Sequence, residues 1–163
     1  MKRGGILDMS DALDTLYREV ILDHYKHPRG KKKLDHASLR NEGKNPTCGD
    51  EIEIEIDLDH DTVKDLSVSC AGCAISVASG SMLYEVIKGK SVDEVKKIAQ
   101  VVKAMLKGEE YSTEGIDIGD LDVLEGVKKF PVRIKCALLS WTTLVDALDR
   151  KSNSETERVS STE

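Results

Sequence analysis

The chain has 163 residues and a formal net charge of −6, from 24 lysines and arginines against 30 aspartates and glutamates. This length fits one domain with its own core, and the acidic excess argues against a protein that binds nucleic-acid phosphates. No apolar stretch approaches the about 20 residues of a membrane span, and residues 1–5 lead into a polar segment instead of a signal-peptide core, so we expect a cytoplasmic protein that binds no membrane.

The first predicted element is a helix over residues 10–26. Ser10 can cap it, apolar residues recur along it at helical spacing, and Pro28 with Gly30 ends it.

Two predicted strands follow this helix. Residues 51–56 alternate strictly between glutamate and isoleucine, as in a half-buried strand.

A second strand is predicted over residues 63–70, with a hairpin turn over residues 57–61 before it. Because two strands alone are marginally stable, a third is needed, and residues 37–41 are the nearest candidate. The sequence therefore predicts a small antiparallel sheet.

Helical segments fill the second half of the chain. Residues 75–86 have helical spacing, and Gly89 stands where a left-handed cap is favoured. Ser91 and Glu94 form a capping box that opens the next helix, and Gly108 ends it.

A short helix is expected over residues 120–129, and Pro131 begins the last one. Residues 152–163 are polar and are expected to form a disordered tail after a single domain over residues 1–151. The element order predicts an α+β fold, with a small three-stranded antiparallel sheet packed with about five helices on one face.

The cysteines are the candidate functional residues, because thiols in a reducing compartment are more often ligands or nucleophiles than disulfides. Cys48 lies in a tight loop two residues before Asp50, and Cys73 stands where a strand meets a helix. Cys136 lies in the first two turns of the last helix, whose peptide dipoles favour a thiolate.

Arg133 and Lys135 flank Cys136 and are expected to lower the pKa of its thiol if their side chains turn toward the sulfur. Three thiolates and a carboxylate from these segments can form a four-coordinate zinc site, and the same sulfurs can hold a 2Fe–2S cluster. A carboxylate among thiolates suggests an exchangeable ligand. The residues alone leave the choice open.

Other candidates have simpler interpretations. Cys70 and Cys73 form a C-x-x-C pair, but no second pair accompanies it, and strand alternation places Cys70 on the buried face as a core thiol. His24 and His27 have the spacing of metal ligands on a helix face, yet Pro28 follows at once and no carboxylate partner is evident.

Three motifs occur in order: NPTCGD at residues 45–50, GCAIS at residues 72–76 and FPVRIKCA at residues 130–137. With residues 16–29 they resemble the SufU/IscU family of U-type iron–sulfur cluster assembly proteins, similar to the N-terminal part of NifU. The resemblance spans roughly residues 13–148. It implies a three-stranded antiparallel sheet packed with helices.

The resemblance implies that Cys48, Asp50, Cys73 and Cys136 bind the metal or cluster. It also implies a pyridoxal-phosphate cysteine desulfurase as the partner that donates persulfide sulfur. The implied function is iron–sulfur cluster assembly with sulfur accepted at a zinc-bound Cys3Asp site, at most as a zinc-dependent sulfurtransferase. The alternative is a scaffold for a labile 2Fe–2S cluster, passed to apo-proteins or other Suf components.

In the implied sulfur relay, zinc holds the thiolates ionised until the docked desulfurase displaces one ligand. Cys48 is then the thiolate expected to attack the persulfide, and Asp50, Arg133 and Lys135 are expected to tune its release electrostatically.

Two features look like the SufU branch of the family. Lys135 stands where the IscU branch has a histidine, and a longer segment around residues 108–121 separates Cys73 from Cys136. Both favour a zinc-bound sulfur acceptor over a stable cluster scaffold. Phe130 replaces the first proline of the IscU branch's chaperone-binding motif, so dependence on a dedicated Hsp70 chaperone is not expected.

Overall fold

The computed structural model describes residues 9–161, with the side chains of residues 15–151. The backbone differs from two predictions: Ser10 lies inside the first helix, which already includes Met9, and residues 152–161 of the predicted disordered tail continue the last helix. The elements are α1 (Met9–Lys26), β1 (Leu39–Asn45), β2 (Asp50–Asp59), β3 (Thr62–Ala71), α2 (Ala74–Ile87), α3 (Val92–Lys107), η1 (Gly119–Lys129) and α4 (Pro131–Ser161).

The sheet is antiparallel throughout, in the order β1-β2-β3. Its central strand β2 buries Ile52, Ile54 and Ile56 on one face, as the alternation predicts. The predicted third strand exists as β1, but it begins two residues later and ends four residues later than the predicted range of 37–41. The hairpin turn is shorter than predicted, because pairing continues past a register shift at Asp57 and leaves only two residues between the strands.

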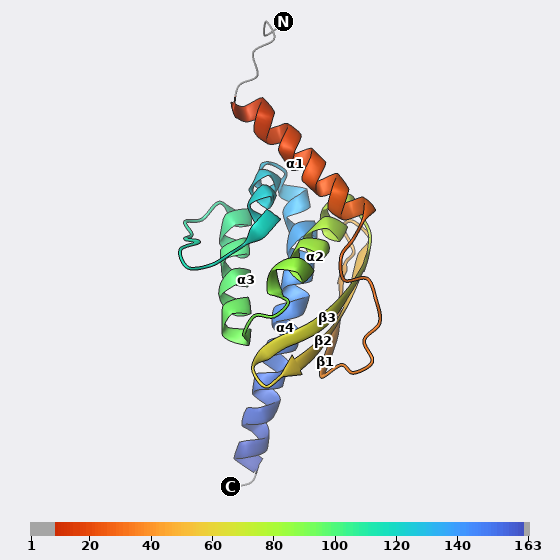
Figure 1. The fold of residues 1–163 in the computed structure, drawn as a ribbon, viewed down its shortest axis with the longest axis vertical. Coiled ribbons are helices and arrows are strands. Elements are labelled where there is room, and N and C mark those ends of the chain that lie inside the picture. Colours follow the sequence, from red (N-terminus) through yellow and green to blue (C-terminus); the bar gives the residue numbers. More distant parts are fainter. Residues whose placement is uncertain (1–8, 162–163) are drawn as a thin grey trace, which may run out of the picture.

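All helices that contact the sheet lie on one of its faces, which confirms the predicted α+β class (Figure 1). The helices α2 and α4 pack directly against the strands, and α3 packs against α4 on the side away from the sheet. Small residues let α2 approach closely, since a Cβ on Gly80 would lie 3.1 Å from a Val68 methyl group. α2 is therefore buried on most of its surface.

The predicted helix ends are confirmed for α3. The Ser91 hydroxyl accepts from the Glu94 N–H at 3.2 Å, and Gly108 ends the helix with φ of 74°. The short segment over residues 120–129 is a 3-10 helix. Its apolar residues recur every three positions and match three residues per turn, and the buried ones are Leu121, Leu124 and Val127.

No helix among the described residues is long and apolar enough to cross a membrane.

Candidate metal centre

Cys48 lies in the tight turn between β1 and β2. Its backbone N–H donates to the Asn45 carbonyl at 3.2 Å, and Gly49 takes the left-handed conformation, with φ of 72°. The thiol is partly exposed, whereas Asp50, the first residue of β2, is 1% exposed. The loop thus presents a thiol at the surface and anchors a carboxylate beneath it.

The Asp50 carboxylate is fixed at the N-terminus of α2. The Cys73 backbone N–H donates to its Oδ1 at 2.8 Å, and the Ser76 hydroxyl donates to its Oδ2 at 2.6 Å. Burial alone would raise the pKa of Asp50, but these hydrogen bonds outweigh it and hold the pKa below the ordinary value. Gly72 is needed beside it, because any Cβ there would overlap the carboxylate.

The remaining two thiols come from the N-terminal ends of helices. Cys136, in α4, is buried, and its Sγ lies 2.9 Å from the Cys48 Sγ. Cys73, at the cap position of α2, places its Sγ 4.0 Å from Asp50 Oδ2. The donor atoms of Cys48, Asp50 and Cys136 all lie within 4.8 Å of one another. The structure therefore brings Cys48, Asp50 and Cys136 together, with the Cys73 sulfur beside Asp50 but outside that group of three.

The charge environment differs from the sequence-based prediction at Cys136. Burial, together with hydrogen bonds to Cys48 and Asp50, raises the pKa of the Cys136 thiol, so the predicted lowering is wrong for the metal-free chain. Arg133 instead interacts with Cys73, and this hydrogen bond raises the pKa of the guanidinium. Lys135 is exposed, and its electrostatic role stays a prediction.

Cys70 is partly buried on β3 and packs against the core, as expected for a core thiol. Burial, with the negative charges of Asp50 and Cys73 adding to it, raises the pKa of the Cys70 thiol to about 12. A thiol that stays protonated is a poor ligand and a poor nucleophile.

The donor set fits a borderline-soft divalent ion such as zinc, which binds both thiolate sulfur and carboxylate oxygen. When bound, zinc would keep its thiolate ligands ionised, including that of the buried Cys136. Asn45 supports that state, because its Nδ2 donates to the Cys136 Sγ at 3.7 Å. The residues present therefore fit the zinc ion that the sequence implies.

The centre opens to the surface at Cys48. A cavity of about 610 Å³ is lined by this thiol and by the segment that begins α4. Two apolar side chains of that segment are exposed, Phe130 at 51% and Val132 at 62%. Exposed apolar residues beside a reactive group are typical of a protein docking site.

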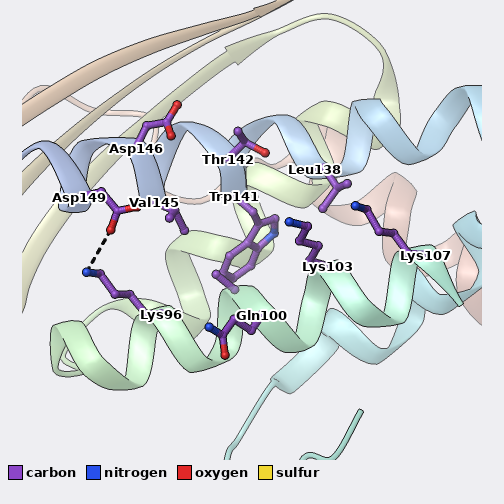
Figure 2. Close-up of a pocket in the computed structure, with 11 residues that line it drawn as sticks. Lys96, Gln100, Lys103, Lys107, Leu138, Trp141, Thr142, Val145, Asp146 and Asp149 are labelled. Atoms are coloured by element: carbon purple, nitrogen blue, oxygen red, sulfur yellow. Dashed lines mark ion pairs between the residues drawn. The ribbon is translucent and has the colours of Figure 1, made fainter. Parts of the chain in front are cut away.

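Another groove, between α3 and α4, has a volume of about 560 Å³ (Figure 2). Trp141 forms part of its apolar floor, and Lys103 and Lys107 line its rim. No cysteine lines it, so it is separate from the metal centre.

Fold and site define a small α+β domain in which a partly exposed group of thiol and carboxylate side chains could hold a metal ion. Residues 16–137 match the model of the NifU-like N terminal domain family, and the chain belongs to that family. The predicted resemblance is thereby confirmed.

The chain is 48% identical over 132 residues to the zinc-dependent sulfurtransferase SufU of Bacillus subtilis (strain 168), covering 81% of this chain and 88% of that protein. It is 37% identical over 143 residues to the iron–sulfur cluster assembly scaffold protein IscU of Streptococcus pyogenes serotype M1, covering 88% and 89%. A crystal structure from Fervidobacterium islandicum AW-1, described as a putative iron–sulfur cluster assembly scaffold protein for the SUF system, superposes with a TM-score of 0.76 at 35% identity, covering 82% and 97%.

Proposed function

We propose that this chain accepts persulfide sulfur at a zinc-bound centre and passes it into iron–sulfur cluster assembly. The ligands are Cys48, Asp50, Cys73 and Cys136. The observation that carries the proposal is that three of these donor atoms lie within 4.8 Å of one another, with the Cys73 sulfur 4.0 Å from the Asp50 carboxylate. The similarity to a zinc-dependent sulfurtransferase supports the choice of metal and chemistry.

Cys48 is the sulfur acceptor in this proposal. It lies in a loop and is partly exposed, whereas Cys136 is buried in a helix. The Cys48 thiolate attacks the outer sulfur of the donor's persulfide, the donor's S–S bond breaks, and the donor cysteine leaves as a thiolate. Cys48 then carries the persulfide. With zinc bound, Asp50, Arg133 and Lys135 would tune the release of Cys48 electrostatically.

The proposed sulfur donor is a pyridoxal-phosphate cysteine desulfurase. It would dock on the exposed Phe130 and Val132, which line the same cavity as the Cys48 thiol. The receiving partners are apo iron–sulfur proteins or other Suf components. The proposed compartment is the cytoplasm, where thiols stay reduced.

The test incubates the zinc-loaded chain with a desulfurase and cysteine and measures intact mass. We expect a gain of one sulfur atom in the parent and in Cys70→Ala, the matched control, and none in Cys48→Ala. If Cys48→Ala accepts sulfur as fast as the parent, the relay is wrong.

A cluster scaffold is the second candidate function, favoured by the carboxylate among the ligands and by the similarity to a scaffold protein. Anaerobic reconstitution with iron and sulfide, followed by visible absorption and transfer to an apo-ferredoxin, distinguishes it. A stable coloured chain that transfers its cluster would favour the scaffold, and a colourless zinc protein would favour the relay.

A further inference from the structure

A second group of metal-ligand atoms lies outside the cysteine centre. His24 of α1, Glu85 of α2 and Asp120 of η1 place one imidazole nitrogen and two carboxylate oxygens within 4.8 Å of one another. The His24 Nε2 lies 3.0 Å from Asp120 Oδ2 and 3.6 Å from Glu85 Oε1. The sequence does not favour a metal site at His24 and His27, because no carboxylate partner is evident in it; the structure supplies two carboxylates for His24, whereas His27 is exposed and belongs to neither group.

The three side chains of this group differ in their exposure to solvent. The imidazole is 0% exposed, while the side chains of Asp120 and Glu85 are 54% and 44% exposed. The buried ring therefore directs Nε2 toward two solvent-facing carboxylates. An ion from solution can reach the two carboxylates directly.

The other ring nitrogen of His24 forms a hydrogen bond with Ser81. Its Nδ1 lies 2.7 Å from the Ser81 hydroxyl, which also accepts from the Arg29 backbone N–H at 2.9 Å. Histidines that bind metals usually have their second nitrogen fixed by a hydrogen bond, which sets the ring orientation and the tautomer. Without an ion, Nε2–H donates to Asp120 at 3.0 Å. When an ion binds, it replaces this proton on Nε2, and Nδ1 can then carry the ring proton and donate to Ser81.

The local charge balance also suits a cation. The Arg29 guanidinium lies 2.8 Å from Asp23 and 3.7 Å from Glu85, so one positive charge is shared between two carboxylates. Asp120 adds a third negative charge. Ligand atoms about 2.1 Å from a common ion are separated by about 3.0 to 3.4 Å, close to the spacing of the His24 nitrogen from both oxygens.

We propose that His24, Glu85 and Asp120 bind a divalent cation of the Fe²⁺ and Mn²⁺ class, with water completing its coordination. One imidazole and two carboxylates form a harder donor set than the cysteine centre, so the two sites select different metals. Ser76, which holds Asp50, and Glu85 lie on the same helix, about 14 Å apart along its axis. The cation site does not depend on Cys48 accepting sulfur.

Mn²⁺ is the probe. The zinc-loaded chain is titrated with Mn²⁺, and free Mn²⁺ is followed by electron paramagnetic resonance, with zinc keeping the thiolates occupied. We expect one Mn²⁺ per chain. Asp120→Asn and Glu85→Gln should each weaken binding by about tenfold or more. Asp122→Asn, which makes the same charge change on an exposed neighbour in η1, should leave binding within about twofold.

Location and metal class are tested separately. Bound Mn²⁺ should broaden the amide NMR signals of His24, Ser81 and Asp120 first. Anaerobic Fe²⁺ should displace it, because Fe²⁺ binds such ligands more tightly than Mn²⁺. The proposal is overturned if no Mn²⁺ binds, if folded Asp120→Asn binds it as the parent does, if broadening centres on Cys48, or if Fe²⁺ fails to compete.

Discussion

Replacing Ser76 with alanine tests how the metal centre holds its carboxylate. The Ser76 hydroxyl donates to Asp50 Oδ2 at 2.6 Å, and both residues are 1% exposed. Ser79 is a matched control one turn along α2. It is 0% exposed, and its hydroxyl donates at 2.6 Å to the neutral Ala137 carbonyl. The two variants differ mainly in the charge of the acceptor.

The magnitudes follow from that difference. A hydrogen bond to a charged group contributes about 1.5 to 3 kcal/mol to stability, against about 0.5 to 1.5 kcal/mol for a neutral pair. We therefore expect Ser76→Ala to lower the free energy of unfolding by about 2 kcal/mol at neutral pH, and Ser79→Ala by about 1 kcal/mol. Both values refer to the metal-free chain, in which zinc does not add its own contribution.

The two effects should also depend differently on pH. Burial alone would raise the pKa of Asp50, but hydrogen bonds led by that from Ser76 lower it below 3.8 in the folded state. A lowered carboxyl pKa stabilises the fold above the unfolded pKa, and this stability is lost as pH falls through the folded pKa. The cost of Ser76→Ala should therefore shrink below about pH 4, while that of Ser79→Ala stays constant.

Urea unfolding of both variants and the parent, with a chelator present and at several pH values from 7 to 3, provides the measurement. Equal destabilisation by the two variants, or a Ser76→Ala effect that does not change with pH, would show that Asp50 is not held as an ionised group.

Three further outcomes are expected. Gly72→Ala should lose bound zinc, measured as metal per chain, while Gly89→Ala should keep it. Both positions have a positive φ, but only a Cβ at Gly72 would overlap Asp50. Equal zinc content in the two variants would contradict this reasoning. Cys70 should react with iodoacetamide at pH 8 about a thousandfold more slowly in the folded chain than in urea, because its pKa rises from 9.0 to about 12 and the thiol stays protonated. Mass spectrometry measures both rates, and similar rates would refute the argument from burial. Chelation should lower the melting temperature without unfolding the chain, because the hydrophobic core cluster around Ile54 includes none of the four ligands. Loss of the circular dichroism signal at room temperature would instead indicate that the metal only closes the fold.

Local patterns in the sequence predicted most of the elements, although not all of their bounds. The glutamate and isoleucine alternation predicts β2, and the Ser91 and Glu94 capping box predicts the start of α3, because both signals depend on neighbours in the chain. The cysteine motifs, through their resemblance to a family, also indicated the ligand set. The strand alternation and the capping box depend only on residues close together in the chain, so they do not require knowledge of the tertiary packing.

Only the tertiary structure decided the rest. Burial of Cys136 raises the pKa of its thiol, although its place near a helix N-terminus suggested the opposite, because desolvation depends on what packs around it. The carboxylates that meet His24 come from α2 and η1, segments far along the chain, and no local spacing reveals them. Convergence and burial are properties of the packed molecule, since each is set by residues that the sequence separates.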